Sequence, residues 1–189
     1  MTKTERPEAQ VRPPAGRSGG GTDPGWPAPA VDFAGLYEAH ARAVHRFVLF
    51  LSGDPALADD LVSETFIRLW SARGRVEPAT VRGYLFAIAR NLFLHERRRA
   101  GRTAELDGHP ADGRPGPDAR AESRSELRAV LALLQALPEA DRAAVLMRAE
   151  SGLSYEEIAA VLGISLAAAK VKVHRARLRL AAAREERTR

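Results

Sequence analysis

The stretch of sequence that decides the fold is SYEEIAAVLGIS, residues 154–165, and the basic segment KVKVHRARLRL follows it at residues 170–180. Ser154 and Glu157 have the spacing of a capping box. In that motif the serine oxygen and the glutamate carboxylate satisfy free backbone N–H groups at the start of a helix. A short helix is therefore expected to begin directly after Ser154.

The same stretch predicts how that helix ends. Ile158 and Leu162 lie on its apolar side, Gly163 supplies a turn, and Ser165 is a typical N-cap for the next helix. Small residues at Ala159 and Gly163 allow two helices to cross closely. The pattern is that of a helix-turn-helix, although an ordinary helical hairpin shares it.

Charge decides between these two interpretations. The segment after the turn carries several cations and no acid: Lys170, Lys172, Arg175, Arg177 and Arg179. A helix that lies against DNA phosphates needs such a surface. We therefore expect this helix to contact DNA rather than to be merely a solvated face.

The composition of the whole chain agrees with a nucleic-acid partner and excludes several classes of site. The 189 residues carry a formal charge of +5, and 26 of the 29 cations are arginines. A basic balance of this kind suits a polyanion, although a GC-rich genome also favours arginine. Because the chain has no cysteine, it has no disulfide, thiolate zinc site, iron–sulfur cluster or cysteine nucleophile.

Working outward from the motif, apolar residues at helical spacing occupy two blocks, which a segment rich in Gly, Pro and charge separates. The sequence predicts an all-α fold of two small helical domains joined by a flexible linker. The expected parts are a disordered N-terminal tail (1–30), a first domain (31–100), the linker (101–124), a second domain (125–183) and a C-terminal tail (184–189).

The first domain is expected to contain three or four helices. The first helix runs from about Asp32 to Gly53, and Asp54 with Pro55 forms a start signal for the second. Thr80 is the expected cap of the third helix.

That third helix has a basic and aromatic face. Arg82, Arg90 and Arg97 recur at helical spacing, with Phe86 and Phe93 between them. Arginines beside aromatic rings suit single-stranded DNA, because the cations follow the backbone while the rings stack on bases. Packing of both phenylalanines on the first helix is the favoured alternative to base stacking.

Two blocks of this sequence resemble one protein family. LPEADRAAVLMRAESGLSYEEIAAVLGIS (137–165), followed by KVKVHRARLRL, resembles region four of the sigma-70 family of RNA polymerase sigma factors. DDLVSETFIRLW (59–70) and VRGYLFAIARNLFLHERRR (81–99) resemble region two. Because both blocks occur in the family's order with little else, the chain resembles the small extracytoplasmic-function (ECF) group.

The resemblance implies a non-catalytic promoter-specificity subunit that directs core RNA polymerase to promoters with minus-ten and minus-35 elements. The minus-35 element would be bound by Ser165, Lys170, Lys172, His174, Arg175 and Arg177. The minus-ten element would be bound by Arg75, Arg82, Arg90 and Asn91. Core polymerase would be bound by Asp59, Asp60, Leu61, Glu64 and Phe66.

Two features qualify these assignments. Asp59 and Asp60 lie at a helix start, where acids also simply complement the helix dipole. Ala168 and Val171 replace hydroxyl residues that are frequent in relatives, so base discrimination would rest on contact with thymine methyl groups, on Ser165, or on DNA shape. His174 is the other side chain of this helix that could hydrogen-bond to a base.

The resemblance also bears on partners and location. Core RNA polymerase and promoter DNA are the expected partners, and an anti-sigma factor is a candidate because many relatives are held inactive by one. We expect a cytoplasmic, nucleoid-associated monomer. Membrane insertion is not expected, because no apolar run approaches the roughly 18 residues that span a bilayer.

Other classes of function fit less well. No cofactor or metal is expected, since the five histidines are scattered and no phosphate-binding glycine loop occurs. A recombinase or transposase would need a nucleophile or paired carboxylates, which the first block lacks. The main alternative is a stand-alone helix-turn-helix repressor or activator with residues 31–100 as a sensor or dimerisation domain. A helical scaffold protein is a third possibility, which the basic helix disfavours.

Overall fold

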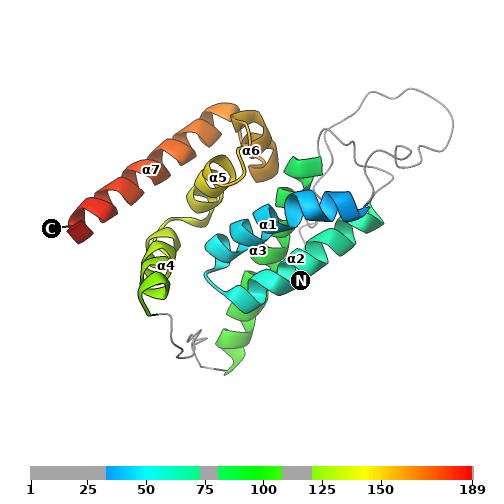
Figure 1. The fold of residues 1–189 in the computed structure, drawn as a ribbon, viewed down its shortest axis with the longest axis horizontal. Coiled ribbons are helices and arrows are strands. Elements are labelled where there is room, and N and C mark those ends of the chain that lie inside the picture. Colours follow the sequence, from blue (N-terminus) through cyan, green and yellow to red (C-terminus); the bar gives the residue numbers. More distant parts are fainter. Residues whose placement is uncertain (1–32, 73–80, 108–120, 189) are drawn as a thin grey trace, which may run out of the picture.

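The computed structural model describes residues 33–72, 81–107 and 121–188, and every regular element within them is an α-helix (Figure 1). In chain order the helices are α1 (Phe33–Ser52), α2 (Pro55–Ser71), α3 (Val81–Asp107), α4 (Ala121–Gln135), α5 (Glu139–Ala149), α6 (Tyr155–Leu162) and α7 (Leu166–Thr188). The predicted all-α class is confirmed. The predicted N-terminal tail (1–30) and the predicted Thr80 cap lie outside the described residues.

Helices α1, α2 and α3 form an N-terminal unit, in which the start of α2 is fixed locally. The Asp54 carboxylate accepts hydrogen bonds from the backbone N–H groups of Ala56 and Leu57. These groups have no partner within the helix, and because Pro55 carries no N–H, the cap satisfies two of the three free donors at this end. The helix begins at Pro55, as the sequence predicts.

The aromatic residues of α3 belong to the core of this unit. Phe86 is fully buried and meets Phe47 of α1 edge to face, with ring centroids 5.0 Å apart. Phe93 is buried as well, and the Arg97 guanidinium lies 5.9 Å from the centre of its ring. The predicted packing on the first helix is confirmed for Phe86, Phe93 is buried as well, and neither ring is available for stacking on a base.

Helices α5, α6 and α7 build the predicted helix-turn-helix. Ser154 Oγ accepts a hydrogen bond from the Glu157 N–H at 3.1 Å, and the Glu157 carboxylate accepts one from the Ser154 N–H at 2.7 Å, which confirms the capping box. Gly163 ends α6 at a φ of 66°, a conformation that glycine adopts without a Cβ penalty. Ala169 and Val173 are buried where α7 packs on α5 and α6.

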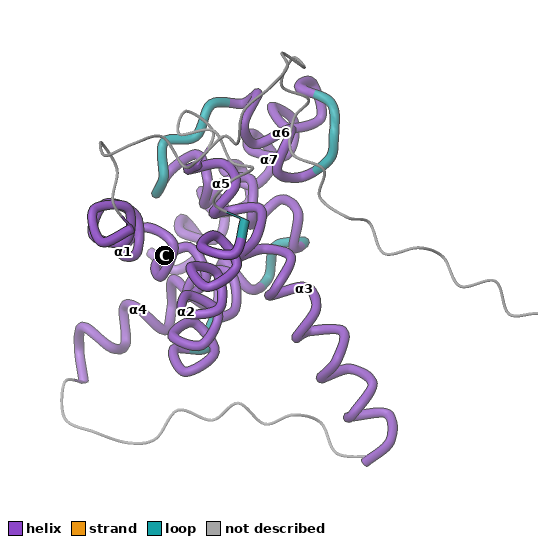
Figure 2. Tube along the Cα trace, turned by 90° about the vertical axis from the view of Figure 1, so that its right-hand side faces the viewer, coloured by secondary structure: helices purple, strands orange, loops and turns teal. Residues whose placement is uncertain are grey.

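The two units pack against each other. Helix α1 contacts α4 and α5, and α3 contacts α6, an arrangement that Figures 1 and 2 show from two directions. The buried apolar side chains form one core that continues from α1 into α7. The two helical domains expected from the sequence are therefore found in a closed arrangement rather than apart.

The helices reach into the segment predicted as linker. Helix α3 continues through Gly101 to Asp107, and α4 begins at Ala121. This corrects the predicted linker (101–124) at both ends, and residues 108–120 lie outside the described part of the chain. A glycine within a helix costs only about 1 kcal/mol relative to alanine, and good helix formers on both sides offset that cost.

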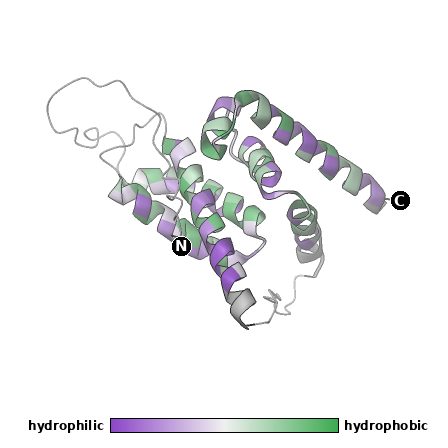
Figure 3. Ribbon diagram, turned by 180° about the vertical axis from the view of Figure 1, so that it is seen from behind, coloured by the Kyte–Doolittle hydropathy of each residue, from purple (hydrophilic) through white to green (hydrophobic). Residues whose placement is uncertain are grey.

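Helix α7 is also longer than expected. It runs to Thr188, which corrects the predicted C-terminal tail (184–189). Alanine, arginine and glutamate fill its last turns, and these residues favour a helix even where little packs against it. Hydrophilic and hydrophobic residues alternate along its length (Figure 3).

Candidate nucleic-acid interface

Helix α7 presents a basic surface that begins at a capped end. The Ser165 Oγ accepts a hydrogen bond from the Ala168 N–H at 3.2 Å, which fixes the start of the helix while leaving Ser165 exposed. Lys170, His174 and Arg177 are exposed farther along α7. These predicted minus-35 residues lie on one helix and face outward.

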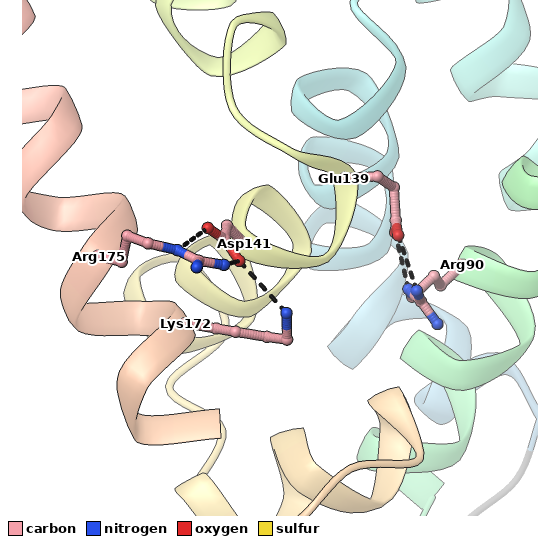
Figure 4. A network of polar contacts seen from close by, with 5 residues as sticks. All are labelled: Arg90, Glu139, Asp141, Lys172 and Arg175. Carbon is pink, nitrogen blue, oxygen red and sulfur yellow. Dashed lines mark hydrogen bonds and ion pairs between the residues drawn. The ribbon is translucent and has the colours of Figure 1, made fainter. Parts of the chain in front are cut away.

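Two other predicted cations of α7 face a buried carboxylate. Arg175 donates two hydrogen bonds of 2.6 Å to the oxygens of Asp141 in α5, and Lys172 Nζ lies 3.4 Å from Asp141 Oδ1 (Figure 4). The Asp141 side chain has no exposed surface, whereas that of Arg175 is 46% exposed. Lys172 and Arg175 therefore hold α7 against α5, in addition to any role at DNA.

The environment of Asp141 stabilises its charged form. Hydrogen bonding from Arg175 lowers the pKa of this carboxyl, and the positive charges of Arg175 and Lys172 act in the same direction against the opposing effect of burial. A carboxylate held in this way keeps both cations ordered.

Sequence reasoning missed Asp141, although the sequence does carry a signal for it. Asp141 lies one turn before Ala144 and Val145 and one turn after Leu137, all of which are buried. An acid on the apolar side of a helix needs a buried partner, and the basic helix that follows offers two.

The cations of α3 that were predicted to bind the minus-ten element face the C-terminal unit. Arg90 donates two hydrogen bonds of 2.8 Å to the two carboxylate oxygens of Glu139 in α5 (Figure 4). The side chains of Arg90 and Glu139 are only 13% and 11% exposed. In the closed arrangement Arg90 is therefore shielded from solvent and already has an anionic partner.

Arg82 meets the same unit near the start of α6. Its Nη2 donates to the Gly152 carbonyl oxygen at 3.3 Å and lies 3.5 Å from Glu157 Oε2. Burial tends to raise the pKa of Glu157, but hydrogen bonds from Ser154 and the charge of Arg82 outweigh it, so the pKa is lowered. Of the other predicted minus-ten residues, Asn91 is half-buried on α3 and Arg75 lies outside the described residues.

The predicted polymerase-binding helix exposes its acids. Asp59 and Asp60 are exposed near the start of α2, and Asp59 Oδ1 lies 3.1 Å from His45 Nε2. Glu64 is half-buried and accepts a hydrogen bond of 2.7 Å from Arg68 one turn later. The acidic edge expected from the sequence is therefore accessible on α2.

The apolar part of the predicted polymerase surface needs correction. Leu61 and Phe66 are 4% and 2% exposed, because they lie on the side of α2 that packs into the core. Ile67 and Trp70 are the exposed apolar side chains of α2, at 59% and 49%. Leu61 and Phe66 thus belong to the core, and the apolar surface that α2 exposes is formed by Ile67 and Trp70.

Two kinds of feature are absent from the three described ranges. No helix there is long and apolar enough to cross a bilayer. No group of three or more His, Asp or Glu side chains in those ranges is arranged to hold a metal ion.

Known proteins match the chain in the order that the sequence predicts. Sigma-70 region 2 matches residues 36–103, and Sigma-70 region 4 matches residues 127–180. The ECF RNA polymerase sigma factor EcfG of Rhodopseudomonas palustris is 37% identical over 149 residues, which cover 76% of this chain and 80% of that protein. The chain is an ECF sigma factor of the sigma-70 family. Helices α1–α3 are its region two, and α4–α7 are its region four.

Other relatives of this sigma factor agree. The ECF sigma factor SigE of Mycolicibacterium smegmatis is 40% identical over 152 residues, or 77% of this chain, although the match spans only 58% of that protein. The sigma factor RpoE of Bartonella quintana, crystallised with the anti-sigma factor NepR, has a TM-score of 0.72 at 29% identity, and the match covers 82% of this chain and 97% of that one. CnrH, crystallised with the cytosolic domain of CnrY, has a TM-score of 0.63 at 28% identity, with coverage of 82% and 88%.

Family membership decides between the functions that the sequence left open. An ECF sigma factor directs RNA polymerase to promoters and is a non-catalytic subunit, so the predicted function is confirmed. The alternative of a stand-alone repressor or activator does not account for a region two that precedes region four.

Proposed function

We propose that region four of this sigma factor binds the minus-35 element through the outward face of α7. The observation that carries this proposal is a capped helix whose exposed side chains include Ser165, Lys170, His174 and Arg177. No acid occurs between Leu166 and Arg184. Such a surface neutralises phosphates along a groove wide enough to admit a helix.

Lys172 and Arg175 take a different part in the same interface. Because Asp141 holds both, they position α7 on α5 and restrict its rotation. Arg175 is exposed enough to share its guanidinium between Asp141 and a phosphate, whereas Lys172 is mostly covered. We assign phosphate affinity mainly to Lys170 and Arg177.

Apolar contacts complete the proposed reading surface. Val171 and Leu178 are 60% and 58% exposed on α7, and Leu166 at its first turn is 37% exposed. An aliphatic side chain in the major groove can recognise the methyl group of thymine. We therefore expect a thymine-containing minus-35 element.

For region two we propose that Arg82, Arg90 and Asn91, together with Arg75, contact the minus-ten element. The support is the basic face of α3, because arginines at helical spacing can follow a single-stranded backbone. Phe86 is buried and takes no part in stacking.

We propose that core RNA polymerase binds the exposed side of α2. Asp59, Asp60 and Glu64 would repel DNA but suit a basic protein surface, and Ile67 and Trp70 offer apolar contact beside them. Asp59→Asn combined with Asp60→Asn should weaken binding of core polymerase by about tenfold. Glu185→Gln with Glu186→Gln, on the far end of α7, is the matched control and should leave binding unchanged.

An anti-sigma factor is the third proposed partner. The similar sigma factor RpoE of Bartonella quintana was crystallised with the anti-sigma factor NepR, and CnrH was crystallised with the cytosolic domain of CnrY. We propose the same kind of inhibitor for this chain, acting in the cytoplasm where polymerase and DNA are found. We also propose that the sigma factor acts as a monomer.

Run-off transcription on genomic fragments, with holoenzyme reconstituted from this chain and core polymerase, tests the assignment of α7. Lys170→Ala with Arg177→Ala should lower transcription about tenfold and reduce the salt slope of promoter binding by about one unit for each lost phosphate contact. Arg128→Ala removes a comparably exposed cation from α4 and should change neither quantity. Equal behaviour of the double variant and the control would remove the outward face of α7 from the promoter interface.

A further inference from the structure

Among the residues that the structure describes, three ion pairs join region two to region four, and all three have the same polarity. Every arginine belongs to region two and every glutamate to region four: Arg46 with Glu150, Arg82 with Glu157, and Arg90 with Glu139. We call the three glutamates the acidic strip. All three glutamates of the strip face region two, and their negative charges complement the positive charges of its arginines.

The Arg90 pair is the most protected of the three. Its two N–H···O bonds of 2.8 Å are the bidentate geometry that a guanidinium also uses with a phosphate. Because both side chains are nearly covered, water screens this pair less than it screens a surface pair. Figure 4 shows the side chain of Arg90 in region two directed at that of Glu139 in region four.

Other contacts hold the same arrangement at the far end of α1. Gln135 of α4 donates hydrogen bonds to the carbonyl oxygens of Phe50 and Leu51, at 3.2 and 3.3 Å. These carbonyls lie in the last turn of α1, where the helix itself supplies no N–H donors for them. Arg142 of α5 in turn donates to Gln135. Region four therefore contacts region two along α1 as well as along α3.

We propose that the acidic strip of region four occupies the promoter face of region two in the free protein and competes with DNA phosphates for Arg82 and Arg90. This inference rests on the proposed minus-ten role of these two arginines. A guanidinium whose fork is filled by a carboxylate cannot grip a phosphate at the same time. Region two therefore binds the minus-ten element only after region four has moved away.

The competition should change the affinity of region two for DNA by a measurable factor. The apparent dissociation constant equals the intrinsic one divided by the fraction of molecules in the open state. A closed state favoured about ten to one therefore weakens DNA binding by region two about tenfold. Core polymerase, which separates the regions if it binds them at different places, would remove this penalty.

Neutralising the strip tests the inference in the full-length chain. The variant carries Glu139→Gln, Glu150→Gln and Glu157→Gln, because glutamine keeps the shape of each side chain and can still serve in the capping box. The matched control carries Glu126→Gln, Glu156→Gln and Glu185→Gln, three exposed acids of the same region with the same total charge change.

Two measurements distinguish the separation of the two regions from the binding of DNA. Because the chain lacks cysteine, Ser63→Cys and Ala182→Cys accept a fluorophore pair that reports the distance between the regions. Binding is measured with a labelled single strand of about 20 thymidines, a length that exceeds the site of one binding domain. The strip variant should show a longer distance and about tenfold tighter binding than the control variant.

Each alternative outcome would contradict a different step of the proposal. An unchanged distance in the strip variant overturns the inference and leaves the proposed function intact. A longer distance without tighter binding overturns the competition. Adding Arg82→Ala and Arg90→Ala to the strip variant should abolish the gain in affinity; if the gain persists, both the competition and the proposed minus-ten role of these arginines are wrong.

A charge exchange provides a check that does not depend on the stability of the triple variant. Arg90→Glu with Glu139→Arg keeps the ion pair but reverses its direction, so the closed distance should be retained. Arg90→Glu alone places two carboxylates together and should lengthen that distance. Equal distances in the single and exchanged variants would mean that this pair does not hold the regions closed.

Discussion

At the scale of the residue, Asp141 links the stability of region four to its affinity for DNA. Asp141→Asn keeps the shape of the side chain but leaves Lys172 and Arg175 without a counter-charge. The loss of charge-assisted hydrogen bonds should lower the free energy of unfolding by about 2 kcal/mol. The released cations should raise affinity for duplex DNA of unrelated sequence and steepen its salt slope by up to about two units.

Denaturant unfolding and a salt titration with such a duplex measure both effects. Glu156→Gln is the control, because Glu156 is an exposed acid of the same region. Its unfolding free energy and salt slope should match those of the unchanged protein. A salt slope of Asp141→Asn equal to that of the control would show that Lys172 and Arg175 do not reach phosphates once released.

The lowered pKa of Asp141 predicts how region four responds to acid. The pKa of an unfolded aspartate is about 3.9, and that of folded Asp141 lies lower because of its hydrogen bonds with Arg175. The stabilisation is therefore fully present above about pH 4 and is lost as the pH falls through the folded pKa. Thermal unfolding from about pH 5 downward should show a steeper loss of stability for the unchanged protein than for Asp141→Asn.

At the scale of the element, Ser165 has two roles that substitution can separate. As the N-cap of α7 it accepts a hydrogen bond from Ala168, and Ser165→Ala should cost about 1 kcal/mol of stability. Ser165→Asp retains a capping oxygen, so stability should stay near that of the unchanged protein. Its negative charge should nevertheless weaken binding to promoter DNA about tenfold. Equal DNA binding by both variants would limit Ser165 to capping.

Three helix starts could be predicted because capping is a local property. Asp54, Ser154 and Ser165 each satisfy N–H groups that lie within three residues along the chain. The ends of α3 and α7 were harder to predict, because several good helix formers can together outweigh a glycine or a lack of packing. Local sequence therefore specified where helices begin better than where they end.

The ion pairs between helices could not be predicted from the periodicity of apolar residues. Arg90 and Glu139 are 49 residues apart in the sequence, and Asp141 and Arg175 are 34 apart. Each partner alone fits an exposed helix position, and only the packing of region four on region two and of α7 on α5 brings the partners together. The same limitation explains why Leu61, which falls beside exposed acids in the sequence, was wrongly assigned to the partner surface of α2.

At the scale of the whole molecule, the segment between α3 and α4 limits how far the regions can separate. Between Asp107 and Ala121 the chain can span at most about 50 Å when fully stretched. For sigma factors that read two elements, about one and a half duplex turns separate the elements, on the order of 50 Å. The segment should therefore be almost taut at a promoter unless the adjoining helix ends unwind.

Shortening that segment is the corresponding test. Deleting residues 109–120, half of the predicted linker (101–124), should abolish run-off transcription from two-element promoters and leave polymerase binding by region two intact. Replacing residues 108–120 with a Gly/Ser chain of equal length should largely preserve transcription, because reach rather than sequence matters. Full activity of the deleted form would mean that the two regions do not bridge the promoter.

The apolar core that runs through both regions makes their separation depend on temperature. Opening exposes buried hydrocarbon to water, and each Å² of apolar surface raises the heat capacity by about 0.45 cal/mol/K. Because hydrophobic attraction weakens on cooling, the closed state should be least favoured in the cold. Between about 5 and 30 °C, the van't Hoff plot for DNA binding by the unchanged protein should therefore curve more than that of the strip variant, and the gap in affinity between them should widen on warming. Parallel plots would show that separation exposes little of the shared core.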